Sequence, residues 1–426
     1  MLRPSLLAAA LLAVAPLAMT PVAVTPLAQA VGGEDPEIRF STFNASLNRT
    51  AAGHLVRDLS TPSNVQAQNV AETIQRVRPD VLLINEFDYA PEAVDLFRDN
   101  YLEVSHHGSE PIDYPYAYIA PSNTGVASGF DLNNDNRLGG PSPRDYGNDS
   151  WGYGEFVGQF GMVVYSKYPI DTDSIRTFRG FRWADMPGAL LPDNPATAAP
   201  ADWYSPAELD RFPLSSKSHW DVPIMIGKKT VHFLVSHPTP PVFDGPEDRN
   251  GTRNHDEIRF WADYIDRNPR RSAYIYDDSG VRGGLAPSEQ FVIAGDLNSD
   301  PLDGDSIVGS AQQLLDHKRI GSAIAPSSDG GPWAAAKQGQ ANLVHESDPA
   351  FDTADFDDRL CCGPGNLRAD YVLPSKAMTV VGSGIFWPKG RNLATGTPAD
   401  EFFYLTGDFP FVPTSDHRQV WVDVRY

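Results

Sequence analysis

Short apolar runs that end on polar side chains constrain the fold more than any other feature of this sequence. The run Val81–Ile84 leads to Glu86, and the run Phe291–Ala294 leads to Asp296. A continuous apolar run of this length is typical of a strand that is buried on both faces. A carboxylate that follows such a strand lies at the rim of the sheet on a rigid support. The sequence therefore predicts a sheet protein whose chemistry gathers at the strand ends.

Three further strand-like segments carry polar side chains at their ends. A single Asp after an apolar run is more often a turn former or a helix cap, so the prediction rests on the whole set. Carboxylate and amide oxygens suit hard cations, which predicts a divalent metal ion, with Mg²⁺ favoured and Mn²⁺ or Ca²⁺ as alternatives. The three segments end in Asn44 after Phe43, in His237 after Val235-Ser236, and in Asp416-His417 after Thr414-Ser415.

Strand-like and helix-like periodicities alternate along the chain. Residues 38–43 alternate as a half-buried strand, and residues 67–74 follow as an amphipathic helix, for which Ser63 and Gln66 form a candidate capping box. Many strands with few helices between them predict an α/β fold in which two packed sheets carry helices on the outside. We expect the other strands at 161–165, 220–226, 230–236, 371–373 and 419–426, a hairpin turn at Gly227-Lys228, and a helix at 258–265.

The first thirty residues have the features of a secretory signal. A basic start at Arg3 precedes an apolar run from Leu6 to Met19, and Ala28-Gln29-Ala30 forms a small-x-small triplet. The run is shorter than the roughly 20 residues that a membrane span needs, and no later stretch is long and apolar enough. We expect cleavage after Ala30 and a secreted mature protein without a membrane span.

The mature chain, residues 31–426, shows neither an internal repeat nor a linker, so we expect one elaborated domain. Residues 105–158 are crowded with Gly, Pro, Asn, Asp and Ser, which predicts a long loop-rich insertion. Within it, Trp151, Tyr153 and Phe156 either line a substrate cleft or anchor the insertion to the body of the protein.

The chain is strongly acidic, with 34 Lys and Arg against 55 Asp and Glu and a formal net charge of −21. Such a chain repels polyanions over long range. This charge argues against a protein that binds nucleic acid tightly, although a nuclease remains compatible because catalysis needs only a local site. We expect a monomer whose partner is a phosphate-ester substrate.

Two further local patterns leave alternatives open. Cys361 and Cys362 are neighbours, and the ~3.8 Å between adjacent Cα atoms is shorter than the ~4.4 Å at which the usual disulfide range begins. They form either a strained vicinal disulfide or two thiols. Asp131–Asp135 resembles the start of a calcium loop, but Asn136 replaces the expected Gly and Ser142 the closing Glu. An Asx-rich turn is the favoured alternative.

Seven stretches, taken in order, resemble the endonuclease/exonuclease/phosphatase superfamily. They run from residue 40 to residue 424, and GDLNSDP and SDH are the most specific of them. The resemblance implies a four-layer sandwich, with two β-sheets face to face and helices on both outer sides. The stretches are FSTFNAS, PDVLLINEFD, GMVVYSKYPI, FLVSHPTPP, FVIAGDLNSDP, RADYVLPS and TSDHRQVWVDV.

The resemblance also implies roles for individual residues. Glu86 would be the principal metal ligand, with Asn44 beside it and Asp416 as a further ligand. Asp296 would orient or deprotonate the attacking water, and Asn298 would hold it. The remaining catalytic residues would be His417, which stabilises the transition state, Asp370, its buried acidic partner, and His237, a second imidazole that contacts phosphate.

Several polar residues outside these motifs are candidates for substrate binding. They lie before the predicted hairpin and in the polar loop that follows His237. Arg side chains in that loop would suit a phosphate group; alternatively, the loop is solvated and caps the helix that follows. The candidates are Lys217, His219, Arg249, Asn250, Arg253 and Asn254.

The sequence therefore predicts a metal-dependent phosphoesterase that hydrolyses mono- or diesters, chiefly small organic phosphates, by in-line attack of water. The alternatives are a secreted non-specific nuclease that uses the same site, a lipid-hydrolysing relative, and a catalytically silent binding module. The last is disfavoured because Glu86, Asp296, Asn298, Asp416 and His417 are all present.

Overall fold

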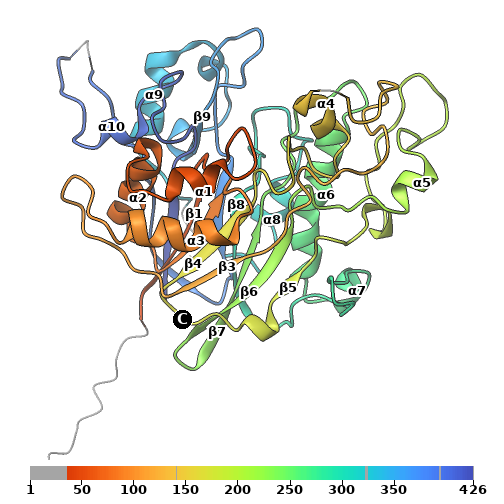
Figure 1. Cartoon of the computed structure of the whole chain (residues 1–426), viewed down its shortest axis with the longest axis horizontal. Helices are drawn as coiled ribbons and strands as arrows, with labels where there is room; N and C mark the ends of the chain where they lie inside the picture. Colours follow the sequence, from red (N-terminus) through yellow and green to blue (C-terminus); the bar gives the residue numbers. More distant parts are fainter. Residues whose placement is uncertain (1–35, 141, 322–324, 393–394, 426) are drawn as a thin grey trace, which may run out of the picture. The chain divides into compact units, whose positions relative to one another are not determined.

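Two β-sheets that pack face to face form the centre of the protein (Figure 1). The computed structural model describes residues 36–140, 142–321, 325–392 and 395–425. The predicted secretory signal, residues 1–30, lies outside the described residues.

The first sheet has six strands in the order β12-β13-β1-β2-β4-β3. Its central pair, β1 and β2, is parallel, and every other neighbouring pair is antiparallel. The strands are β1 (Ile38–Asn44), β2 (Val81–Asn85), β3 (Tyr116–Ile119), β4 (Met162–Ser166), β12 (Thr379–Ile385) and β13 (Val420–Arg425).

The second sheet has five strands in the order β11-β8-β7-β6-β5, and here β7 and β8 are the parallel pair. A separate two-stranded hairpin pairs β9 with β10. The strands are β5 (Arg176–Thr177), β6 (His219–Ile226), β7 (Lys229–Ser236), β8 (Gln290–Asp296), β9 (Ala354–Asp355), β10 (Asn366–Leu367) and β11 (Asp370–Pro374).

Three apolar clusters hold the layers together. The cluster between the sheets contains Val81 and Leu83 of β2, whereas Leu82 and Ile84 of the same strand face the helices on the other side. Because both faces of β2 are buried, its apolar run is continuous rather than alternating. The same holds for β8, whose residues divide between the inner cluster and the one beneath α6.

Helices cover the outer face of each sheet, so the predicted four-layer α/β sandwich is confirmed (Figure 1). On the first sheet lie α1 (His54–Leu59), α2 (Val65–Val77) and α3 (Pro91–Phe97); on the second lie α6 (Arg249–Tyr264) and α8 (Gln312–Leu315). The other helical segments are a π-helical turn (Arg98–Leu102), α4 (Pro143–Asn148), α5 (Pro206–Leu209), α7 (Pro269–Ser272), α9 (Gly330–Gln338), α10 (Phe403–Thr406) and 3-10 turns at Thr172–Ser174, Trp183–Asp185, Gln340–Leu343 and Pro349–Phe351.

Two local predictions were wrong. The cap of α2 is Asn64 rather than Ser63, because the Asn64 side chain accepts from Ala67 N, and the Gln66 amide instead donates to loop carbonyls, among them that of Ala45. The segment 249–254, expected in a polar loop, forms the first turns of α6. Its polar residues pack against neighbouring loops, so the helix begins well before its apolar stripe.

The insertion predicted at 105–158 contains two regular elements, β3 and α4. It is joined to the segment before β6, because Asn123 N donates to Lys217 O at 2.9 Å. Trp151 anchors it further, since its ring packs 5.4 Å from that of Phe212. The Asx-rich turn favoured from the sequence is present, since the Asn133 side chain accepts from Asp135 N at 3.3 Å and the Asp135 side chain accepts from Arg137 N at 2.8 Å.

Cys361 and Cys362 are exposed thiols rather than a disulfide. Among the described residues, no helix combines the length and apolar character that crossing a bilayer requires.

Candidate active site

Strand direction brings the predicted site residues to one edge of the sandwich. In the first sheet Asn44 pairs with Asn85 at the carboxyl ends of the parallel strands β1 and β2. In the second sheet Asp370, the first residue of the antiparallel strand β11, pairs with Asp296, the last residue of β8. His417 lies shortly before β13, which runs antiparallel to β1, so it reaches the same edge.

Hydrogen bonds join the two sheets at this edge. Asn44 Nδ2 donates to Asp296 Oδ2 at 3.0 Å, and Asp296 N donates to Asn85 Oδ1 at 3.3 Å. Close packing also requires Gly295, because a Cβ there would lie 2.0 Å from the carbonyl oxygen of Ser236. The site therefore rests on strand ends that are fixed against one another.

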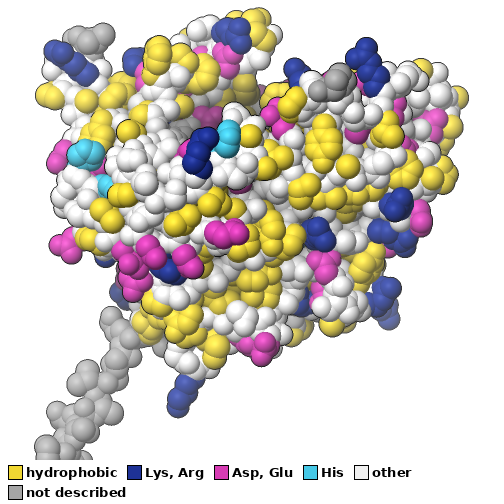
Figure 2. Space-filling model, in the orientation of Figure 1, with side chains coloured by type: hydrophobic (Ala, Val, Ile, Leu, Met, Phe, Trp, Pro, Cys, Tyr) yellow, Lys and Arg dark blue, Asp and Glu magenta, His cyan; other side chains and the backbone are white. Residues whose placement is uncertain are grey.

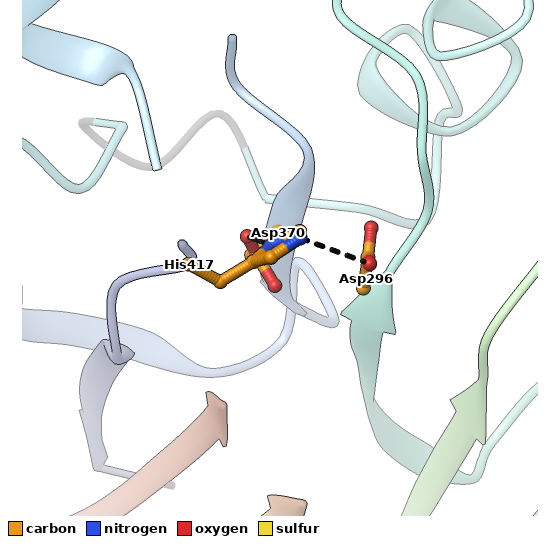
Figure 3. A group of neighbouring side chains, drawn as sticks. All are labelled: Asp296, Asp370 and His417. Atoms are coloured by element: carbon orange, nitrogen blue, oxygen red, sulfur yellow. Dashed lines mark hydrogen bonds and ion pairs between the residues drawn. The ribbon is translucent and has the colours of Figure 1, made fainter. Parts of the chain in front are cut away.

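The ring of His417 lies between two buried carboxylates (Figure 3). Its Nδ1 is 2.8 Å from Asp370 Oδ2, and its Nε2 is 3.7 Å from Asp296 Oδ2. Burial alone would lower the pKa of His417, but the attraction of Asp370 and Asp296 raises this pKa well above its ordinary value. The imidazole is therefore held in its protonated form, with one N–H directed at each carboxylate.

Asp370 is held in turn by Thr353. The Thr353 hydroxyl donates to Asp370 Oδ2 at 2.8 Å and accepts from the backbone N–H of Asp370. Burial raises the pKa of Asp370 to about 6, against the opposing attraction of His417. Sequence reasoning missed Thr353, because a threonine outside any periodic segment carries no signal of its partner.

Asp296 is the centre of the site. Its Oδ1 accepts from Asn298 N at 2.9 Å, and its Oδ2 lies 3.4 Å from His237 Nε2. Burial, with the nearby charges of Lys217 and His417, lowers the pKa of His237 well below its ordinary value, so that ring is neutral. His237 Nδ1 is buried and has no hydrogen-bond partner among the described residues.

Glu86 lies half-buried where β2 ends, in left-handed backbone with φ 59°. Burial, together with the nearby charge of Asp416, raises its pKa to about 7 against the opposing effects of His417 and Asn44. Asn298 also has left-handed backbone, with φ 50°. Backbone of this kind is uncommon for residues other than glycine and is frequent at functional sites.

Two separate donor sets at this edge could hold a metal ion. Asp296, Asp370 and His417 each offer an atom, and these atoms all lie within 4.8 Å of one another. Glu86, with Asn44 and Asp416 beside it, offers oxygen atoms alone. Burial, and after it the negative charge of Asp416, raises the pKa of Glu86, and a bound cation would offset both effects by stabilising the carboxylate. The residues present therefore fit a divalent cation.

A cavity of about 480 Å³ opens beside this site, and Glu86 and His237 line it. Four of the six residues predicted to bind substrate line it as well: Lys217, Arg249, Asn250 and Arg253.

The other two predicted substrate-binding residues, His219 and Asn254, are not brought to the cavity. The His219 ring is buried between Ser215 Oγ and the carbonyl of Glu257. The Asn254 amide donates to the carbonyls of Thr239 and Leu297, the residues that follow β7 and β8. Both side chains tie loops together and are enclosed by protein.

Glu257 of α6 is another residue that sequence reasoning missed. Its carboxylate accepts from Ser216 N at 2.7 Å and from Thr239 N at 2.6 Å. It thereby holds the segment that carries Lys217 against the segment that follows His237. A buried glutamate within a polar helical stretch gives no sequence signal of this role.

The fold and the site define a class of hydrolase in which two sheets present carboxylates, amides and paired imidazoles at one edge. The sequence profile of the Endonuclease/Exonuclease/phosphatase family matches residues 41–417. The chain belongs to this family, whose members are metal-dependent hydrolases of phosphoric ester bonds, and it is an enzyme of that kind.

Comparison with curated proteins finds no match. Among solved structures, an endonuclease/exonuclease/phosphatase from Beutenbergia cavernae is 16% identical with a TM-score of 0.44, over 91% of this chain and 71% of that one. Sphingomyelinase C from Streptomyces griseocarneus is 16% identical with a TM-score of 0.42, over 91% and 99%. A Staphylococcus aureus beta toxin variant with bound magnesium is 15% identical with a TM-score of 0.40, over 91% and 99%.

The hydrogen bonds that link Thr353 to Asp370 and Asp370 to His417 predict a graded loss of activity in variants. Asp370→Asn should lower kcat for phosphoester hydrolysis by about 10²–10⁴-fold, because the imidazole loses its charged partner. Thr353→Val removes only the hydroxyl that holds Asp370 and should lower kcat about 10-fold. Steady-state kinetics on folded variants measure both effects. Wild-type turnover in Asp370→Asn would contradict the assigned partnership.

Proposed function

We propose that the protein is a secreted phosphoesterase that uses a divalent cation and in-line attack of water to hydrolyse small organic phosphate mono- or diesters. The observation that carries the proposal is the arrangement of His417, protonated and held by Asp370, beside Asp296, which in turn lies 3.4 Å from His237 in the lining of a cavity that Glu86 also lines.

Asp296 is positioned to handle the attacking water. Asn44 and Asn298 each donate to its carboxylate, which fixes the orientation of both oxygens. The water oxygen forms the new bond to phosphorus, and Asp296 takes its proton. The bond to the leaving oxygen breaks with its electron pair, and that oxygen takes a proton from bulk water. Asn298 holds the attacking water and a phosphate oxygen.

Attack on a phosphate anion needs local positive charge. Protonated His417 provides one positive charge beside Asp296, close to where charge develops on the phosphoryl oxygens. Neutral His237 contacts the phosphate through a ring nitrogen. Glu86, Asn44 and Asp416 would hold a divalent cation, with Mg²⁺ favoured. A bound cation supplies further compensation of charge on the phosphoryl and leaving oxygens.

Three observations favour a small substrate over a polymer. The cavity volume of about 480 Å³ lies within the ~300–1,000 Å³ range of small-molecule sites. The chain carries a net charge of −21, which repels long polyanions. On the face that Figure 2 shows, the Lys and Arg side chains of the described residues lie apart, interspersed with acidic ones.

Metal removal tests the proposed chemistry. The protein is stripped with a chelator, resupplied with Mg²⁺, Mn²⁺ or Ca²⁺, and offered p-nitrophenyl phosphate, bis-p-nitrophenyl phosphate and plasmid DNA. We expect hydrolysis of a small ester to disappear on chelation and to return with the metal, while plasmid stays intact. His417→Ala and Asp296→Ala serve as inactive controls.

The other outcomes of this assay are decisive. Plasmid degradation that far outpaces ester hydrolysis would replace the proposal with a nuclease that uses the same site. Undiminished ester hydrolysis in excess chelator would contradict the dependence on a metal ion.

The proposal of secretion rests on the leader of residues 1–30, with its apolar run and its Ala28-Gln29-Ala30 triplet. N-terminal sequencing of protein recovered from the culture medium of a secreting host should begin at Val31. If only the uncleaved chain is recovered, and only from the cells, the proposal of secretion is contradicted.

A further inference from the structure

The cavity beside the active site has a wall that the catalytic chemistry does not use. Glu86, His237 and Lys217 line its catalytic end. Much of the remaining lining comes from the insertion, from the segment around Tyr204 and Phe212, and from the first turns of α6. These segments are packed together, since Trp151 of the insertion contacts Phe212.

The charge of the lining is opposite to that of the chain as a whole. Among the lining residues, the cations are Arg144, Lys217, Arg249 and Arg253, and the one carboxylate is Glu86. In a chain with a net charge of −21, such a lining favours an anionic ligand. The amino end of α6, from which three lining residues come, adds to this preference.

The cations of the lining have different neighbours. Lys217 is buried near the negative charges of Glu257, Asp296 and Glu86, and its ammonium donates to Pro238 O at 3.3 Å. Arg249 instead pairs with Glu247 and lies 6.0 Å from the ring of Trp203. Lys217 is therefore placed for the reacting phosphate, and Arg249 for a second anionic group.

Aromatic side chains line the same cavity. Tyr204 and Phe212 have ring centroids 4.6 Å apart, and Arg253 stacks over Phe212 at 4.8 Å. Tyr153 also lines the cavity, its ring 6.4 Å from that of Phe160, yet it is 45% exposed. A half-exposed aromatic ring at a cavity wall is available to stack against a ligand.

We propose that this cavity binds the leaving group of the substrate, and that the group has a flat aromatic body with an anionic group at its far end. The inference rests on the proposed function and names its substrate class: a small phosphate ester of an aromatic alcohol that carries a carboxylate or a second phosphate. Tyr153 packs against the ring, and Arg249 pairs with the distal anion.

Three esters test this proposal: ethyl, benzyl and 4-carboxybenzyl phosphate, each as the monoester and as the methyl diester. Their leaving alcohols are of similar acidity, so differences in kcat/KM report binding. We expect kcat/KM to rise about 10-fold from ethyl to benzyl. A further rise of about 10-fold is expected from benzyl to 4-carboxybenzyl.

Two variants and one control show which residue causes each preference in kcat/KM. Tyr153→Ala should bring the benzyl-to-ethyl ratio of kcat/KM close to 1, and Arg249→Gln should do the same for the 4-carboxybenzyl-to-benzyl ratio. Arg270→Gln, at an exposed position on α7 and absent from the cavity lining, should keep both wild-type ratios. Matching thermal melting curves establish that each variant is folded.

The outcomes separate this proposal from the proposed function. Metal-dependent hydrolysis with both wild-type ratios near 1 would overturn the leaving-group site and leave the proposed function standing. If none of these esters is hydrolysed, calorimetric binding of the three monoesters to the chelator-treated enzyme decides the leaving-group site, and the proposed function fails only if the p-nitrophenyl esters are not hydrolysed either. An affinity that rises from ethyl to 4-carboxybenzyl phosphate would support the leaving-group site, and equal affinities would overturn that site.

Discussion

The rest of the structure depends on how the protein holds buried negative charge at one edge of its two sheets. Asp296 and Asp370 are both buried, and Glu86 and Asp416 lie close by. Buried carboxylates are costly unless they are paired and hydrogen-bonded. The protonated imidazole of His417 compensates the charge of Asp296 and Asp370. Asn44 and Asn298 donate to the two oxygens of Asp296, and Thr353 donates to Asp370 Oδ2, whereas Asp370 Oδ1 is buried without a partner among the described residues. The pKa of Glu86 stays raised, chiefly because of burial. The positive charge of His417 and the Asn44 amide therefore compensate the charge of the Glu86 carboxylate only in part.

Two kinds of structure meet at this edge. The reacting groups stand on strand ends that pair in register, so their positions follow from the sheets themselves. The cavity beside them is lined largely by loops, short helices and the first turns of α6. Rigid elements hold catalytic groups accurately, whereas loops vary their side chains without disturbing the core. We therefore propose that in this protein the strand ends carry the phosphoester chemistry and the loops determine the choice of ester.

Much of the fold was predictable because β2 and β8 have two buried faces and therefore continuous apolar runs. The short strand β3 was not, since it lies within a segment dominated by turn-forming residues. Most of the site followed from motifs at strand ends. Thr353 and Glu257 did not, because their roles depend on contacts between distant segments. His219 was misleading for the same reason: it lies next to cavity residues in sequence, yet its ring packs among Phe260 and Trp261.

The position of the bound cation tests the account most directly. Crystals of the chelator-treated protein, soaked in Mn²⁺, would locate the ion by its anomalous scattering. We predict an anomalous peak for Mn²⁺ at the Glu86 carboxylate, on the side of Asn44 and Asp416. His417 should still be paired to Asp370. A peak enclosed by Asp296, Asp370 and His417 would contradict it, because the imidazole would then be a metal ligand and not a protonated group facing the substrate.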